Sequence, residues 1–246
     1  MSRPQLSIEN LSKSYGNGKL ELKVIEDLSL SIKAGRFISI IGPNGSGKTT
    51  LLKIIAGIEK PSAGQVKTPG SIAYLPQEGS LMPWLSVRDN LRLPAKIKGA
   101  TSSKLEKKID RYLAQFGLSE FDNFYPAALS GGMRQKVALI RTAIYKPDLI
   151  ILDEPFSALD AITRLQMQTW LVKLWLELKC SVVCVTHDIS EAIFLGDEIY
   201  VLSSRPAKII RRLAIDAKRP REIDDLNGKK MLSIQKKLRE LLVNEN

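Results

Sequence analysis

Residues 42–49 read Gly-Pro-Asn-Gly-Ser-Gly-Lys-Thr and match the phosphate-loop pattern G-x-x-x-x-G-K-[ST] at every fixed position. The apolar run 37–41 predicts a buried strand before this loop, and residues 49–56 predict a helix after it. Glycines let the backbone N–H groups of such a loop point at phosphate oxygens, and the helix dipole favours negative charge. The predicted nucleotide-binding residues of this segment are Gly42, Pro43, Asn44, Gly45, Ser46, Gly47, Lys48, Thr49 and Thr50.

Two carboxylates follow the apolar run 149–152, which is typical of a buried parallel strand. Ligands bind at the carboxyl ends of such strands, so we expect Asp153 and Glu154 to face a phosphate group held by Lys48. Asp153 and Thr49 are predicted to hold Mg²⁺, and Glu154 to orient or deprotonate the attacking water. The alternative is that Asp-Glu-Pro only ends a strand with a turn.

Composition places the chain among ordinary globular proteins, with 44% apolar and 26% charged residues in a length of 246. No apolar run reaches the roughly 18–20 residues of a membrane helix, and residues 1–6 lack the core of a secretory signal, so we expect a cytoplasmic location. Cys180 and Cys184 are predicted to be reduced thiols in a strand. The net charge is +11, but no basic run contains interleaved aromatic residues, so no nucleic-acid partner is expected.

Strands and helices alternate along the chain, which predicts an α/β domain with a mostly parallel sheet. Alternating residues in three early segments predict antiparallel strands, and a helical insert of about 86–145 forms a second lobe of one domain spanning 1–246. A short basic tail of about 215–246 ends in an amphipathic helix. The expected strands are 6–11, 20–25, 28–32, 64–67, 72–75, 149–152, 181–186, 198–202 and 207–214, and later helices are 130–145, 162–178, 189–195 and 228–243.

A second anion-binding motif occurs at residues 129–135, Leu-Ser-Gly-Gly-Met-Arg-Gln, where a helix is predicted to begin. The hydroxyl of Ser130, the amides of Gly131 and Gly132 and the helix dipole together suit an anion. One nucleotide needs one cradle, so the second loop is interpreted as serving a nucleotide bound by another copy of the chain. The alternative is an ordinary helix cap followed by a flexible glycine pair.

The order of these motifs resembles that of ATP-binding cassette ATPases, over residues 6–214. Segment 129–135 resembles the family signature, and the resemblance implies that Ser130, Gly131, Gly132 and Gln135 contact ATP. It implies that Gln77 senses Mg²⁺, the attacking water and a membrane partner. His187 resembles the switch histidine of the family, and Asp160 the end of its D-loop, Ser157-Ala158-Leu159-Asp160. Tyr15 falls where members of the family stack an aromatic ring on adenine.

What the resemblance implies about function is an ATP- and Mg²⁺-dependent ATPase with the fold of these cassettes: a parallel core, an antiparallel subdomain and a helical lobe carrying the signature. Glu154, His187, Gln77 and Lys48 would be catalytic in an ATP-sandwich homodimer. Segments 77–85 and 201–206 resemble the nitrate, sulfonate and taurine branch of importers. That branch implies a separate membrane permease, a substrate-binding protein, and a position at the cytoplasmic face of the membrane.

Several alternatives stay open. The chain could serve an exporter or lipid transporter, or act as a soluble non-transport cassette, and a small-molecule kinase is a further reading. Leu81 and Trp84 are expected either to receive a permease helix or to pack within the helical lobe. Trp170 and Trp175 are expected to be core or surface residues of one helix. The tail helix is interpreted as a solvated segment, with dimer bracing or contact with anionic lipid as alternatives.

Overall fold

The computed structural model describes residues 5–16, 20–77, 81–100, 102–157, 159–219, 221–222, 224–243 and 245. Most of the expected turn at 16–18, Ala158 of the D-loop segment and residues 78–80 beside Gln77 lie outside these residues. No helix in the described part of the chain has the length and hydropathy of a membrane span.

The main sheet confirms the prediction of a mostly parallel core. In the described residues its strand order is β5-β6-β7-β3-β8-β9, and only β9 runs antiparallel to its neighbour. Its central strands are buried on both faces, as parallel strands covered by helices must be. The strands are β3 (Phe37–Ile41), β5 (Ile72–Leu75), β6 (Leu149–Asp153), β7 (Ser181–Val185), β8 (Glu198–Leu202) and β9 (Ile209–Ala214).

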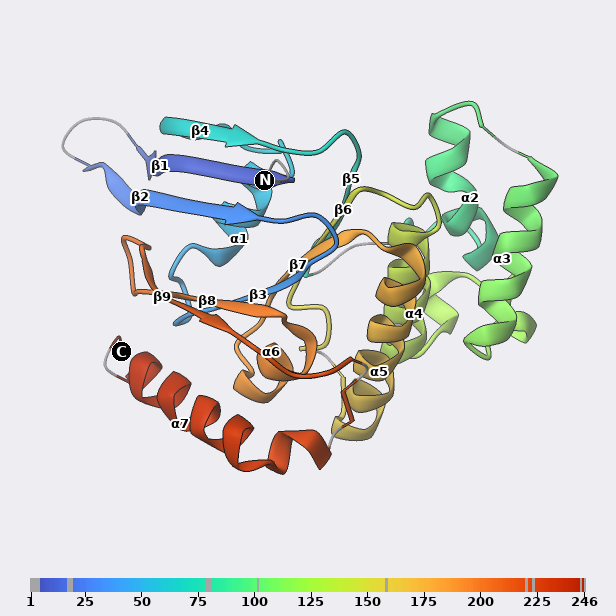
Figure 1. Cartoon of the computed structure of the whole chain (residues 1–246). Coiled ribbons are helices and arrows are strands. Elements are labelled where there is room, and N and C mark those ends of the chain that lie inside the picture. The colour runs from blue at the N-terminus through green and yellow to red at the C-terminus, as the bar shows by residue number, and fades with distance from the viewer. Residues whose placement is uncertain are drawn as a thin grey trace.

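A smaller antiparallel sheet, in the order β2-β1-β4, lies above the main sheet in Figure 1. Its strands are β1 (Leu6–Tyr15), β2 (Leu22–Ile32) and β4 (Ala63–Lys67). The two strands expected at 20–25 and 28–32 are one strand, because an irregularity at Asp27 joins them: its φ is 49° and its N–H donates to the Ser12 hydroxyl. Helix α1 (Lys48–Ile55) packs between the sheets.

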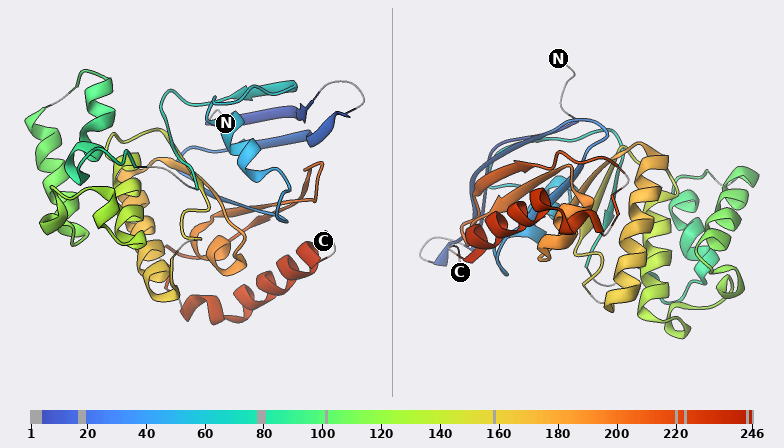
Figure 2. Two further views of the ribbon diagram at one scale, coloured as in Figure 1. Left: turned by 180° about the vertical axis from the view of Figure 1, so that it is seen from behind. Right: turned by 60° about the horizontal axis from the view of Figure 1, so that its bottom comes forward.

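The helical lobe projects from one end of the molecule (Figures 1 and 2). It contains α2 (Val87–Ile97), α3 (Ser103–Gln115), the short helices η2 (Ser119–Phe121) and η3 (Pro126–Ala128), and α4 (Gly131–Ala143). Ser86, Ser102 and Ser130 each accept a backbone N–H at a helix start. The Arg88 guanidinium pairs with carboxylates of the next segments, including Asp122 at 2.7 Å, and ties the lobe together.

Helix α5 (Ala161–Leu178) connects the lobe to the main sheet. Trp170 and Trp175 are buried in it, as expected. Ile162 and Leu165 have the helical spacing of the apolar residues that follow them in α5, but their exposed fractions are 72% and 37%. The first turns of α5 extend beyond the packed core.

The tail is more than a solvated segment. Helix α7 (Lys229–Val243) follows η4 (Asp224–Asn227) and packs along α6 (Ile189–Leu195), with Met231 and Leu238 buried. Before it, the Arg221 guanidinium donates to the carbonyl oxygens of Ile193 at 2.6 Å and Gly196 at 2.7 Å. These bonds satisfy acceptors at the carboxyl end of α6. The preference for a merely solvated tail is therefore corrected: its polar face is solvated and its apolar face is docked.

Candidate nucleotide-binding site

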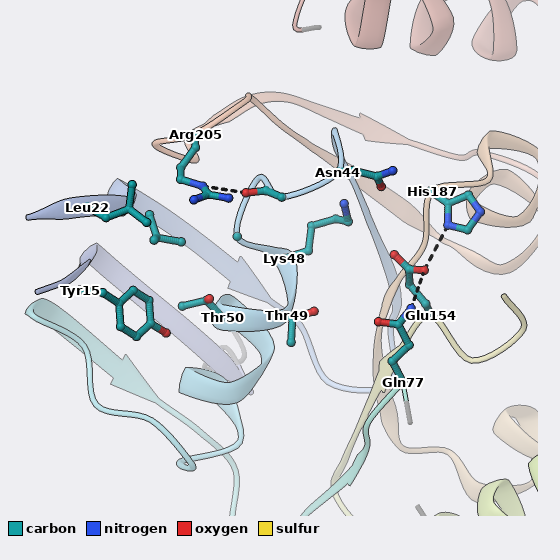
Figure 3. A pocket seen from close by; sticks show the side chains of 13 residues that line it. Tyr15, Leu22, Asn44, Lys48, Thr49, Thr50, Gln77, Glu154, His187 and Arg205 are labelled. Atoms are coloured by element: carbon teal, nitrogen blue, oxygen red, sulfur yellow. Dashed lines mark hydrogen bonds and ion pairs between the residues drawn. The ribbon is translucent and has the colours of Figure 1, made fainter. Parts of the chain in front are cut away.

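A cleft of about 730 Å³ opens beside the phosphate loop (Figure 3). Its walls come from β1 and β2 of the small sheet, from the loop before α1, and from segments that follow β5, β6, β7 and β8. The lining residues are Tyr15, Leu22, Val24, Asn44, Gly45, Gly47, Lys48, Thr49, Thr50, Gln77, Glu154, His187 and Arg205. The fold thus brings together residues that are far apart in the sequence, at the carboxyl end of the parallel strands.

The phosphate loop takes the shape that its glycines allow. Gly47, at the start of α1, has φ 104°, and a Cβ there would lie 2.9 Å from a methyl of Val24. Gly45 has φ 74°. A side chain at position 47 would therefore meet both backbone strain and a clash with β2. Close approach of the small sheet to the loop explains why glycine is required there.

Lys48 is buried, and its ammonium donates to the carbonyl oxygens of Gly42 at 2.9 Å and Pro43 at 2.8 Å. Burial lowers the pKa of Lys48, an effect that the nearby carboxylates of Glu154 and Asp153 oppose. The loop therefore holds a desolvated positive charge at its own centre, which is the arrangement that an incoming polyphosphate needs.

Asp153 and Thr49 meet at the end of β6. The Thr49 hydroxyl donates to the Asp153 carboxylate at 3.2 Å, and the Tyr74 hydroxyl donates to its other oxygen at 3.3 Å. Burial raises the pKa of Asp153 above its ordinary value, while these two hydrogen bonds act against the shift. Sequence reasoning missed Tyr74, although its place in the strand that ends before Gln77 was a signal that the side chain could reach this edge.

The oxygens of Thr49 and Asp153 fit a magnesium ion bound together with a nucleotide. Mg²⁺ is held in proteins through one or two carboxylates, with water and substrate phosphates completing the shell. The described residues contain no cluster of three or more histidine, cysteine or acidic side chains able to hold a metal by themselves. The donor set therefore suits a cation that arrives with a phosphate.

Glu154 meets two other predicted catalytic residues. The Gln77 amide donates to its carboxylate at 3.4 Å, and the Nδ1 atom of His187 lies 3.2 Å from the same oxygen (Figure 3). The backbone of Glu154 has φ 46°, a conformation that costs roughly 1–2 kcal/mol in a residue with a Cβ. Strained backbone in a non-glycine residue at a cleft is typical of a functional position.

The aromatic ring of Tyr15 lies at the outer end of the cleft, on β1, and is 39% exposed. The Lys13 ammonium lies 4.7 Å from its centroid. Burial and the neighbouring Glu59 raise the pKa of Tyr15, while Thr50 at the start of α1 acts against the shift. The ring thus lies where the base of a nucleotide would extend from phosphates bound at the loop. Its role in adenine stacking stays a prediction.

The signature residues lie outside the cleft. Ser130 is exposed and accepts the N–H of Met133 at 3.3 Å, so it caps α4. Gln135 donates to the backbone carbonyl of Pro155, and Asp160 caps α5 by accepting the N–H of Ile162 at 3.1 Å. Neither of these last two side chains faces the cleft.

The two glycines of the signature also lie outside the cleft. A Cβ at Gly132 would lie 3.0 Å from a methyl of Thr163, whereas Gly131 is exposed. Within one chain, the two predicted phosphate-binding loops therefore do not face the same cleft.

Arg205 is the second residue of the site that sequence reasoning missed. It lies in the turn after β8, and its Nε donates to the Gly45 carbonyl at 2.9 Å. The stretch containing it was used only as a marker of a family branch. Its position directly after a parallel strand, at the same edge of the sheet as Asp153 and His187, was the signal that could have placed it here.

Comparisons with known proteins agree with this geometry. The family model described as ABC transporter matches residues 25–157. The taurine import ATP-binding protein TauB of Roseobacter denitrificans is 40% identical over 214 residues, which cover 83% of this chain and 80% of that protein. The nitrate import ATP-binding protein NrtD of Synechocystis sp. is 36% identical over 219 residues, covering 86% and 82%.

A solved structure with the same fold is the ATP-binding cassette MJ0796, in a dimeric post-hydrolysis state bound to ADP and Pi. It is 32% identical to this chain, and the TM-score is 0.77. The match covers 87% of this chain and all of that one. The fold expected from the sequence is thereby confirmed.

Proposed function

This chain belongs to the ABC transporter family and is an ATPase, and we propose that it powers the uptake of a small solute through a separate membrane permease. The similarity to import ATP-binding proteins carries the transport proposal, and the separation of Ser130 from the cleft around Lys48 carries the proposal of a site shared by two copies. The nitrate and taurine import proteins described above favour a solute of that general kind, a small polar anion or sulfonate.

We propose that two copies pair head to tail, with each ATP held between Lys48 and Thr49 of one copy and Ser130 and Gly132 of the other. A two-fold arrangement of this kind builds two equal sites from one surface. The exposed signature supports it, because Ser130 and Gly131 present a helix start to the outside while their own cleft lies elsewhere. The similar cassette MJ0796, solved as a dimer, supports it further.

In the proposed reaction, water attacks the γ-phosphorus of ATP in line with the leaving oxygen, and the bond to the β-phosphate oxygen breaks. Glu154 accepts the water proton, and His187 and Gln77 hold the Glu154 carboxylate in place through the contacts at 3.2 Å and 3.4 Å. Lys48 stabilises the charge on the phosphate oxygens. Thr49 and Asp153 would hold Mg²⁺, which supplies charge neutralisation when it is bound.

The permease contact is proposed to lie beside Gln77, at the cytoplasmic face of the membrane. Leu81 packs against the hydrophobic core that the lobe shares with the main sheet, as one alternative of the sequence analysis expects. Trp84 is 70% exposed, which supports the proposal that it contacts the permease. An exposed tryptophan is typical of a binding hot spot. A substrate-binding protein would complete the importer.

A complementation experiment tests the shared pocket. Lys48→Ala removes the phosphate charge, and Ser130→Asp keeps a good helix cap while it repels phosphate. Each variant alone should be inactive, but a 1:1 mixture should regain about a quarter of the wild-type ATPase rate, because half of the dimers are mixed and each has one intact site.

The measurement is ATPase rate at concentrations where light scattering shows dimers, with the Glu120→Gln variant, changed at an exposed residue, as the control. No recovery in associated mixtures would contradict the shared pocket. Co-purification of a membrane permease with the tagged chain, and its loss in Trp84→Glu, tests the transport role.

A further inference from the structure

The guanidinium of Arg205 lies against the outer side of the phosphate loop. Its Nε donates to the Gly45 carbonyl at 2.9 Å, and one terminal nitrogen lies 3.0 Å from the position that a Cβ of Gly45 would occupy. In Figure 3 the side chain reaches over the loop from the turn after β8, on the side away from Thr49 and Thr50. Within the described residues it forms no ion pair with a carboxylate.

The turn that carries Arg205 is itself held firmly. The Ser203 hydroxyl accepts the Lys208 N–H at 2.9 Å, and Ala207 exchanges backbone hydrogen bonds with Val24 and Glu26 of β2. The Ser204 N–H donates to the carboxylate of Glu245, at the end of the tail, at 3.0 Å. Contacts with both sheets and with the tail therefore hold the turn from which Arg205 projects.

The contact acts on a peptide group that matters for phosphate binding. In a planar trans peptide the carbonyl of Gly45 and the N–H of Ser46 point in opposite directions. A carbonyl fixed on the outer side of the loop therefore keeps the Ser46 N–H on the inner side, where it donates to the Pro43 carbonyl at 3.2 Å. Gly45 is exposed and has φ 74°, so its own backbone preferences do not fix this orientation.

We propose that Arg205 is a positioning residue for the nucleotide: acting through Gly45, it holds the phosphate loop in the orientation that binds phosphate. The inference rests on the proposed function, in which ATP occupies this cleft. Its specific content is that loss of Arg205 weakens the binding of the phosphates while contacts to the nucleoside persist. The unneutralised guanidinium charge adds favourable potential at the same place.

The test compares Arg205→Ala and Arg205→Lys with Arg211→Ala, a control on the same hairpin that removes the same charge from an exposed site outside the cleft. Dissociation constants for ATP, ADP and adenosine are measured by calorimetry at one ionic strength. Arg205→Ala should weaken ATP and ADP about five- to tenfold, as expected for a lost charge-assisted hydrogen bond at a solvent-exposed site. Adenosine should be unaffected, Lys should restore part of the affinity, and Arg211→Ala should stay within about twofold of the wild type.

A melting curve without nucleotide should be the same for Arg205→Ala and wild type, whereas the rise in melting temperature on adding ATP should shrink. The inference is overturned if ATP affinity stays within twofold of the wild type, or if adenosine loses as much affinity as ATP. If the wild-type chain itself binds no ATP, the proposed function fails rather than the role of Arg205. The two failures are thus separate.

Discussion

The phosphate loop and the signature segment, the two predicted anion-binding segments of this chain, differ in how far the surrounding structure encloses them. Around Lys48, side chains from both sheets converge on one cleft, and the loop is held from the inside by Lys48 and from the outside by Arg205. Around Ser130, the chain provides a capped helix start on an exposed surface, with no further wall of its own. This difference supports the proposal that one chain holds the nucleotide at its phosphate loop and that the signature segment of another copy completes the site.

Contacts within the chain nevertheless connect the signature segment with the cleft around the phosphate loop. Gln135 donates to the carbonyl of Pro155, the residue after Glu154, and Gly132 packs closely on Thr163 of α5. These contacts join the lobe that carries the signature to the segment that carries the proposed catalytic carboxylate. The signature therefore has a structural role besides its proposed contact with ATP.

The largest expected effect separates chemistry from binding. Glu154→Gln removes the proton acceptor while it keeps the shape, and single-turnover ATP hydrolysis should fall about 100-fold or more, as is typical for loss of a general base. ATP affinity should stay within about twofold of the wild type, because Lys48 and the loop are unchanged. Glu120→Gln, which changes an exposed glutamate of the lobe, should hydrolyse ATP normally. Near-normal turnover by Glu154→Gln would remove Glu154 from the mechanism.

The second effect concerns Glu191, a buried residue of α6. It is 5% exposed and accepts a hydrogen bond from Gln168 of α5 at 3.2 Å. Burial raises the pKa of Glu191 from its ordinary 4.5 to about 7. The unfolded chain therefore loses this proton first, and the contribution of Glu191 to stability is present below pH 4.5 and lost as pH rises toward 7.

Glu191→Gln cannot titrate, so its stability relative to the wild type should improve by about 3 kcal/mol between pH 4.5 and pH 7.5. Urea unfolding at several pH values measures the difference. The exposed-site variant Glu120→Gln should show no such trend. A parallel pH dependence in wild type and Glu191→Gln would mean that the carboxyl is ionised in the folded protein.

The smallest expected effect compares the phosphate loop with the signature segment in the monomer. In a dilute, monomeric preparation, Lys48→Ala should weaken ATP binding about tenfold, or about 1.4 kcal/mol, through the lost charge. Ser130→Ala should leave that affinity unchanged, while loss of its helix cap should cost about 1 kcal/mol of stability. Calorimetry and thermal melting check the two results. A monomer in which Ser130→Ala weakens ATP binding would show that the signature already reaches its own cleft.

The sequence predicted the elements that carry a strong local signal. Periodicity placed the central strands and the helical lobe, and the spacing of residues 42–49 placed the phosphate loop at a strand end. The family resemblance implied that Gln77, Glu154 and His187 serve one site, and the structure brings them together after parallel strands. The functional roles of these residues stay predictions until the variants are measured.

What the sequence did not predict depends on contacts across the fold. Tyr74 reads as a strand residue until β6 is seen to place Asp153 beside it, and Arg205 reads as a turn residue until β8 is seen to end over the phosphate loop. Ile162 satisfies a helical pattern, but the packed core stops short of the first turn of α5. Periodicity describes one element, whereas these features depend on where a second element ends.

Two guanidinium groups of the tail cap the carboxyl end of α6, and they affect how short a functional ATPase chain can be. Arg219 and Arg221 bind the last carbonyl oxygens of the short helix that begins immediately after His187 and Asp188. A fragment that ends after β9 would retain each recognisable motif, yet it would lack the contacts of Arg219 and Arg221 with α6, the helix that follows His187. An inventory of motifs is therefore a poor guide to the minimal working length of this enzyme.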